Sequence, residues 1–115
     1  MFQDKMVLCA SSAYEKKFYL NENFEGMPQH VKDELKIMCV LFTEDVGGVL
    51  SLEFDENGNL ELNTSADEGD LLYDEIGSVL KIKQMQQEKQ ELFESLETYY
   101  KVFFLGEDIE DDNGD

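Results

Sequence analysis

The sequence predicts a single α+β domain in which two β-hairpins form one antiparallel sheet and a helix follows each hairpin, in the order ββαββα. Three observations lead to this fold class. Short strand-like runs occur in residues 5–20 and 49–63, and those of the second region alternate between apolar and polar residues. Apolar residues recur at helical spacing from Val31 to Val46. The stretch of residues 70–105 contains no proline and is rich in good helix formers.

The first hairpin is predicted from two strand-like runs, residues 5–11 and 17–20, with residues 12–16 as the turn. Pro28 then suits the first position of a helix. The pair Gly47-Gly48 would end that helix in left-handed geometry. The apolar stripe of this helix is broad, because Ile37 and Leu41 widen a set that recurs every three or four residues: Val31, Leu35, Met38, Phe42 and Val46. In the alternative, the helix stops near Lys36 and residues 37–42 form a buried strand. We favour the helix because the stripe holds its phase to Val46.

The second hairpin is predicted from residues 49–54 and 60–63, which alternate with the two-residue period of a strand. Between them, Asn57-Gly58 is a strong hairpin-turn signal. The acidic segment that begins at Asp55 superficially resembles a calcium loop. A loop of that kind needs glycine at its sixth position and glutamate at its twelfth, and here these positions hold Leu60 and Ala66. A hairpin turn is the better interpretation.

The last helix is predicted to be very long, either as one helix or as two helices in line. At 1.5 Å per residue, residues 70–105 would span about 54 Å. A compact domain of this size has a radius of gyration of about 13 Å, so an unbroken helix would protrude from it. Residues 83–91 are polar apart from Met85. Before them, we expect a core stripe of Leu72, Ile76, Val79, Leu80 and Ile82.

After the polar middle of this helix, a second apolar stripe carries most of the aromatic residues of the segment. It has two interpretations. It belongs to the core of its own chain, or it is a surface for a partner, because aromatic side chains dominate the energetics of interfaces. We predict a homodimer joined through this stripe, whose residues are Leu92, Phe93, Leu96, Tyr99, Tyr100, Phe103 and, at its edge, Phe104.

The charge of the chain narrows the possible partners. The formal net charge is −18, and every basic residue is a lysine. Proteins that bind nucleic acid depend on a basic surface, so we expect no nucleic acid as a partner. Anionic membrane surfaces are disfavoured for the same reason. A basic protein partner remains possible. The start of the chain lacks the pattern of a signal peptide, and residues 37–42, the longest apolar run, are too short to span a bilayer. We therefore expect a cytoplasmic protein.

No motif for catalysis or for a cofactor is present, so the sequence predicts a non-enzymatic protein without a cofactor. His30 is the only histidine, at the start of the first predicted helix. Cys9 and Cys39 sit inside apolar segments, as buried thiols of a reducing compartment do. A catalytic Cys-His pair is possible only if the fold brings His30 next to one of these cysteines. Their spacing matches no zinc site.

The acidic residues 67–75 offer one alternative function. Asp70 and Asp74 are four positions apart, so on a helix they share a face and are weak candidates for a divalent metal. A metal-binding protein or a metal-assisted enzyme would use them. The simpler interpretation is that carboxylates gather at a helix N-terminus because the helix dipole favours them there. A third possibility is an acidic mimic of nucleic acid that occupies a basic protein.

Two other carboxylates are predicted at the end of a helix where the helix dipole disfavours negative charge. If the first helix continues to Val46, Glu44 and Asp45 lie at its negative end, which the helix dipole disfavours by about 0.3–1 kcal/mol each. Either they serve a function or a nearby lysine offsets the cost.

Two long segments of the chain are CVLFTEDVGGVLSLEFDENGNL and the later DEGDLLYDEIGSVLKIKQMQQEKQELFESLETYY. On them rests a resemblance of most of the chain, apart from its acidic tail, to a family of small bacterial domains of unknown function. It implies a compact cytosolic bacterial protein and supplies no activity. The expected organisation is one domain over residues 1–106, followed by a disordered acidic tail over residues 107–115.

Overall fold

The computed structural model of the protein describes residues 5–107. It confirms the α+β class and the antiparallel sheet. The four strands are β1 (Met6–Ser12), β2 (Lys17–Leu20), β3 (Val49–Phe54) and β4 (Leu60–Ser65), and they lie in the order β2-β1-β3-β4. A short 3₁₀ helix, η1 (Glu22–Phe24), and α1 (Gln29–Val46) follow β2. The helices α2 (Glu75–Glu88) and α3 (Gln90–Phe103) follow β4.

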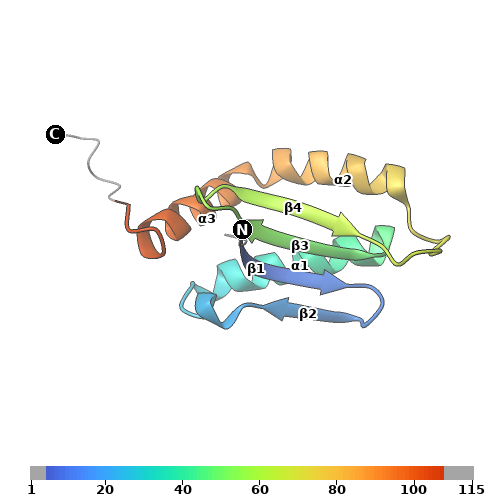
Figure 1. The fold of residues 1–115 in the computed structure, drawn as a ribbon, viewed down its shortest axis with the longest axis horizontal. Helices are drawn as coiled ribbons and strands as arrows, with labels where there is room; N and C mark the ends of the chain where they lie inside the picture. Colours follow the sequence, from blue (N-terminus) through green and yellow to red (C-terminus); the bar gives the residue numbers. More distant parts are fainter. Residues whose placement is uncertain (1–4, 108–115) are drawn as a thin grey trace.

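The helices pack on the sheet at different places. The helix α1 runs behind the sheet in Figure 1 and contacts β1, β2 and β3. The helix α2 lies beyond the edge strand β4 in this view, and α3 continues from it past the start of β4. None of the helices between residues 5 and 107 has the length and apolarity needed to span a bilayer.

A single very long last helix is not found, and that prediction was wrong, whereas the alternative of two successive helices is confirmed. The segment contains two separate helices, because Lys89 leaves helical geometry, with φ −110° and ψ 24°. The first of them starts at Glu75 and not at Asp70, since the Asp74 side chain caps it by accepting a hydrogen bond from the Gly77 N–H at 2.8 Å. The polar stretch around Lys89 has little apolar surface that would hold a single straight helix against the sheet, and the break directs the aromatic stripe of α3 into the core.

Residues 37–42 are helical, as favoured. They belong to α1, which ends where Gly47 and Gly48 adopt φ values of 87° and 71°. The Asp45 carboxylate near that end lies 2.7 Å from the Lys81 ammonium of α2. A lysine from a neighbouring helix therefore offsets the unfavourable position of this carboxylate.

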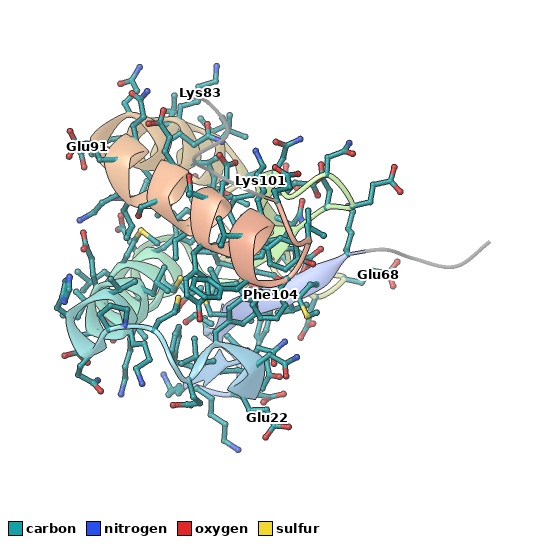
Figure 2. The ribbon with its side chains drawn as sticks, turned by 90° about the vertical axis from the view of Figure 1, so that its left-hand side faces the viewer. Glu22, Glu68, Lys83, Glu91, Lys101 and Phe104 are labelled. Carbon is teal, nitrogen blue, oxygen red and sulfur yellow. The ribbon has the colours of Figure 1, made fainter. Side chains whose placement is uncertain are left out.

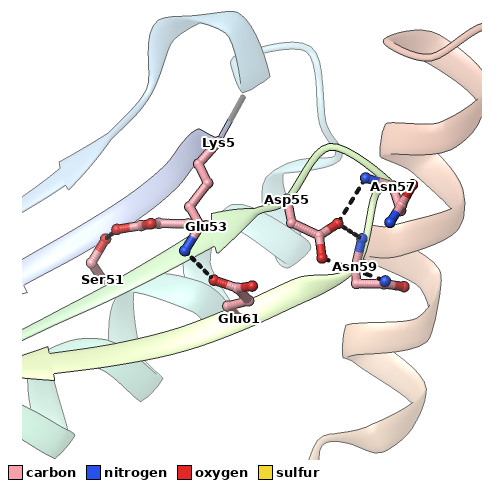
Figure 3. A network of polar contacts seen from close by, with 7 residues as sticks. All are labelled: Lys5, Ser51, Glu53, Asp55, Asn57, Asn59 and Glu61. Carbon is pink, nitrogen blue, oxygen red and sulfur yellow. Dashed lines mark hydrogen bonds and ion pairs between the residues drawn. The ribbon is translucent and has the colours of Figure 1, made fainter. Parts of the chain in front are cut away.

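The hairpin turn between β3 and β4 is held by one carboxylate. Asp55 Oδ1 accepts hydrogen bonds from the backbone N–H groups of Asn57 and Asn59, both at 2.9 Å (Figure 3). Gly58 adopts φ 87°, which favours glycine. The turn interpretation of this segment is confirmed, since the Asp55 oxygens serve the backbone of their own turn. Nearby, Lys5, which precedes β1, pairs across β3 with Glu61 of β4 at 2.8 Å (Figure 3).

A β-bulge fits two consecutive residues of β1 into the core. The register against β3 shifts between Val7 and Cys9, so the side chains of Leu8 and Cys9 are both fully buried. Cys9 Sγ lies 3.9 Å from Cys39 Sγ of α1, and both residues are free thiols.

The end of the molecule that holds α3 has an aromatic core. Phe54 of β3 stacks on Tyr100 of α3, with ring centroids 4.2 Å apart and planes 5° apart. Phe104 stacks on Phe24 of η1 with centroids 4.9 Å apart. Figure 2 shows Phe104 toward the middle of the molecule, whereas Lys83 and Glu91 lie at its outer margin. The acidic tail predicted for residues 107–115 lies outside the described residues apart from Glu107.

Candidate functional site

Most of the large apolar side chains that are exposed among residues 5–107 lie on α1, on α2 and on the loop between β4 and α2. Single exposed apolar residues are normal on a protein surface, but a group of them marks an interaction site. Ile37 and Leu41 of α1 are 60% and 59% exposed. The others in this region are Leu71, Leu72, Ile76, Val79 and Leu80, which are 56–94% exposed.

The helices α1 and α2 form the sides of a groove of about 590 Å³. Met38 and Phe42, which are buried, and Met85, which is partly buried, lie deepest among the lining residues. Ile37 and Leu41 line the α1 side. They are four positions apart and therefore share one face of the helix. The groove thus has an apolar floor and an apolar flank that is open to solvent.

Ion pairs between the two helices stand at both ends of this groove. Near one end, Lys81 Nζ lies 2.7 Å from Asp45 Oδ2, and near the other, Lys89 Nζ lies 2.8 Å from Glu34 Oε2. Glu34 and Asp45 are eleven positions apart on α1, which corresponds to about 16 Å along the helix. The open part of the groove is therefore about three helical turns long.

The rim of the groove carries an excess of negative charge. Lys81 and Lys89 are the basic residues of the rim apart from His30, and each is already paired with a carboxylate. Asp33 and Glu88 lie on the same rim. Their carboxylates accept hydrogen bonds from neutral side-chain amides, Gln29 at 2.9 Å and Gln84 at 2.9 Å, and these bonds leave their charge in place.

The predicted interface stripe of α3 lies mostly in the core of its own chain. Phe93, Leu96 and Tyr100 are 8%, 2% and 5% exposed. Leu92, Tyr99 and Phe104 are partly buried against the same core. Phe103 is the exception, with 70% of its surface exposed. Of the two interpretations that the sequence left open, the burial of these residues agrees with the core.

The prediction that the apolar stripe of residues 72–82 lies in the core was wrong. Leu72 and Ile76 are 92% and 76% exposed, and only Ile82 packs against the core. Sequence reasoning missed the groove because it assigned the apolar stripe of α1 and that of residues 72–82 to the core, and looked for a partner surface only in residues 92–104. The available signal was the width of the α1 stripe. Ile37 and Leu41 extend it beyond the face that one sheet can cover.

The two weak metal candidates serve other purposes in this fold. Asp70 Oδ2 accepts a hydrogen bond from the Tyr14 hydroxyl at 2.5 Å, and its Oδ1 accepts one from the Leu72 N–H at 3.0 Å. The hydrogen bond from Tyr14, followed by that from Leu72, lowers the pKa of Asp70 below its ordinary value. Asp74 is the cap of α2. Over residues 5–107, no three or more His, Cys, Asp or Glu side chains are grouped so as to hold a metal ion.

The cysteine pair has the character of a structural site. The contact with Cys39, together with burial, raises the pKa of the Cys9 thiol far above its ordinary value. The nucleophilic form of cysteine is the thiolate, so this thiol is unreactive. His30 is exposed at the first turn of α1, whereas both cysteines are fully buried. The arrangement does not provide a nucleophile with an adjacent base.

Comparison with known proteins gives a family and no activity. Residues 5–108 match a family of unknown function. No curated protein and no solved structure matches the chain.

Proposed function

We propose that this chain, which belongs to DUF6145, a family of unknown function, is a non-enzymatic protein-interaction domain. Since the family supplies no activity, the proposal is argued from the surface of the protein. The observation that carries the proposal is the apolar groove between α1 and α2. Its flank exposes Ile37 and Leu41 on a helix whose other apolar residues are buried or partly buried. An apolar groove between two helices is a common place for a polypeptide segment to dock.

Burial of the flank supplies a driving force for association. Fully burying a leucine or isoleucine side chain contributes about 1.5–3 kcal/mol relative to leaving it exposed. Ile37 and Leu41 each keep more than half of their surface in water. A partner that covers both, together with the groove floor, therefore gains free energy that folding of the single chain leaves unused.

The homodimer predicted from the sequence was expected to form through the apolar stripe of α3. The burial of Phe93, Leu96 and Tyr100 weighs against a dimer through the stripe of α3. A dimer would use the α1–α2 face instead, and the net charge of −18 opposes the approach of two copies. Binding of a second, basic protein fits the charge better.

The two alternatives from the acidic residues have less support. A metal site at Asp70 and Asp74 competes with the hydrogen bonds that these carboxylates already accept. A mimic of nucleic acid needs a continuous surface of carboxylates, and the exposed apolar residues of α1 and α2 interrupt it. A cytoplasmic location, which we also propose, is supported by two unbridged thiols 3.9 Å apart.

The proposal is tested by affinity capture from a cell lysate with three versions of the chain. They are the native chain, the groove variant Ile37→Ser/Leu41→Ser, and the control variant Leu71→Ser/Leu72→Ser. The control removes two leucines that are 94% and 92% exposed and do not line the groove. We expect a protein that the native chain and the control retain and the groove variant loses. If every captured protein is retained equally by all three versions, the proposed function is wrong.

A further inference from the structure

We propose that the α1–α2 groove binds a basic amphipathic helix of a partner protein. This inference rests on the proposed function, since it names the partner that the groove accepts. It joins three properties of the site: its length, its apolar floor and the charge of its rim.

The length of the groove fits a short helix. The two ion pairs of the groove, Lys81–Asp45 and Lys89–Glu34, are separated by about 16 Å along α1. A helix of about eleven residues covers this distance in three turns. Such a helix presents apolar residues at positions i, i+3 or i+4, and i+7 along one face.

The floor of the groove suits apolar side chains of various shapes. Met38 of α1 and Met85 of α2 line it from opposite sides, beside Phe42. Methionine has three rotatable bonds and a polarizable sulfur, so it adapts its shape to different partners. A third helix therefore packs between α1 and α2 with its leucine-like residues on the methionines and with Ile37 and Leu41 along its side.

The charge of the rim favours lysine or arginine on the polar face of that helix. Asp33 and Glu88 lie on the groove rim, and the rim lysines are already paired. The whole chain, at a net charge of −18, also attracts a basic segment before contact. A second copy of the chain brings the same charge to the same rim. The charge therefore favours the basic helix over a dimer.

Two synthetic peptides of about 14 residues serve as probes. Both place leucine at i, i+3, i+4 and i+7. One carries lysine and the other glutamate at the remaining positions. Binding is measured by calorimetry at physiological salt, and the contact surface is mapped by changes in backbone amide NMR signals. We expect the lysine peptide to bind at least tenfold more tightly than the glutamate peptide, with signal changes concentrated on α1 and α2.

Variants separate the groove from a general attraction between opposite charges. Ile37→Ser/Leu41→Ser is expected to weaken the lysine peptide at least tenfold, and Leu71→Ser/Leu72→Ser to leave it unchanged. Asp33→Asn/Glu88→Gln is expected to weaken it several-fold. The matched control, Glu56→Gln/Glu68→Gln, removes the same charge from exposed positions that do not line the groove and is expected to have no effect. Thermal unfolding of each variant verifies that it is folded.

Each outcome supports or overturns the inference. Equal binding of the lysine peptide to all variants indicates attraction to the acidic surface in general and overturns it. Equal binding of both peptides, lost only in the Ile37→Ser/Leu41→Ser variant, keeps the groove as a docking site and overturns its preference for a basic helix. A dimer by light scattering that this variant converts to a monomer identifies a second copy as the occupant. Binding of neither peptide, with a monomeric chain, overturns the inference, and lysate capture then decides the proposed function separately.

Discussion

Lys89, the residue that separates α2 from α3, lies with its ammonium 2.8 Å from the carboxylate of Glu34 in α1. The break between the last two helices is thus also one end of the groove. A single residue ends one helix, begins the next and joins both to the first helix of the chain.

This ion pair is expected to contribute little to stability. Its two side chains are 35% and 40% exposed, so water screens their attraction. We expect Lys89→Ala to lower the free energy of unfolding by less than about 1 kcal/mol, as for other exposed pairs. A double-mutant cycle with Glu34→Ala, measured by urea denaturation, gives the coupling. A coupling well above this value would mean that the pair holds α3 in place.

Phe93→Asp is expected to unfold the protein. Phe93 is 8% exposed in the core, and the substitution both removes a ring and buries a charge, which costs several kcal/mol. Phe103→Asp is the matched control, because Phe103 lies on the same helix and is 70% exposed. Circular dichroism and light scattering are the measurements. A soluble, folded monomer from Phe93→Asp would instead support the dimer predicted through α3.

Gly48→Ala is expected to destabilise the protein strongly. Gly48 has φ +71°, and an added Cβ would lie 2.5 Å from Ser65 O and 2.8 Å from the Tyr73 ring. Gly69→Ala separates strain from crowding, since Gly69 has φ +84° and nothing within 4 Å of the added Cβ. We expect about 1 kcal/mol for Gly69→Ala and at least about 3 kcal/mol for Gly48→Ala in thermal or urea unfolding. Equal losses would show that the contact with Ser65 and Tyr73 relaxes freely.

The Asp55 turn is expected to weaken in acid. The hydrogen bond from the Asn59 N–H, followed by that from Asn57, lowers the pKa of Asp55 below its ordinary value. A carboxyl group with a lowered pKa stabilises the fold at a pH above its unfolded pKa, which is about 3.9, and loses this contribution as the pH falls through its folded pKa. Asp55→Ala should therefore lower stability at neutral pH and flatten the decline in stability below about pH 4. Parallel declines in the variant and the native chain would assign the acid sensitivity to other carboxylates.

Tyr14→Phe is expected to change the pKa of a residue 56 positions away. The hydrogen bond from the Tyr14 hydroxyl is the main cause of the lowered pKa of Asp70. Without it the pKa of Asp70 should rise toward its ordinary value, as followed by the NMR signal of its carboxyl carbon during titration. An unchanged Asp70 titration would mean that this hydrogen bond does not form in solution.

The sequence by itself determined the elements that depend on local chemistry. The helical spacing from Val31 to Val46 gave α1, and the Asn57-Gly58 pair gave the β3–β4 turn. Such patterns are read correctly because the hydrogen bonds and backbone angles that they specify lie within a few residues.

Tertiary structure alone decided which apolar faces become buried. Phe93 and Ile76 both belong to apolar stripes of the same segment, yet Phe93 is 8% exposed and Ile76 is 76% exposed. The break at Lys89 turns α3 onto Phe24 and Phe54, whereas α2 lies beside α1 and leaves its start uncovered. The periodicity of a stripe records that a helix has an apolar side. Whether water reaches that side depends on contacts between residues far apart in the chain, and the candidate groove exists only through them.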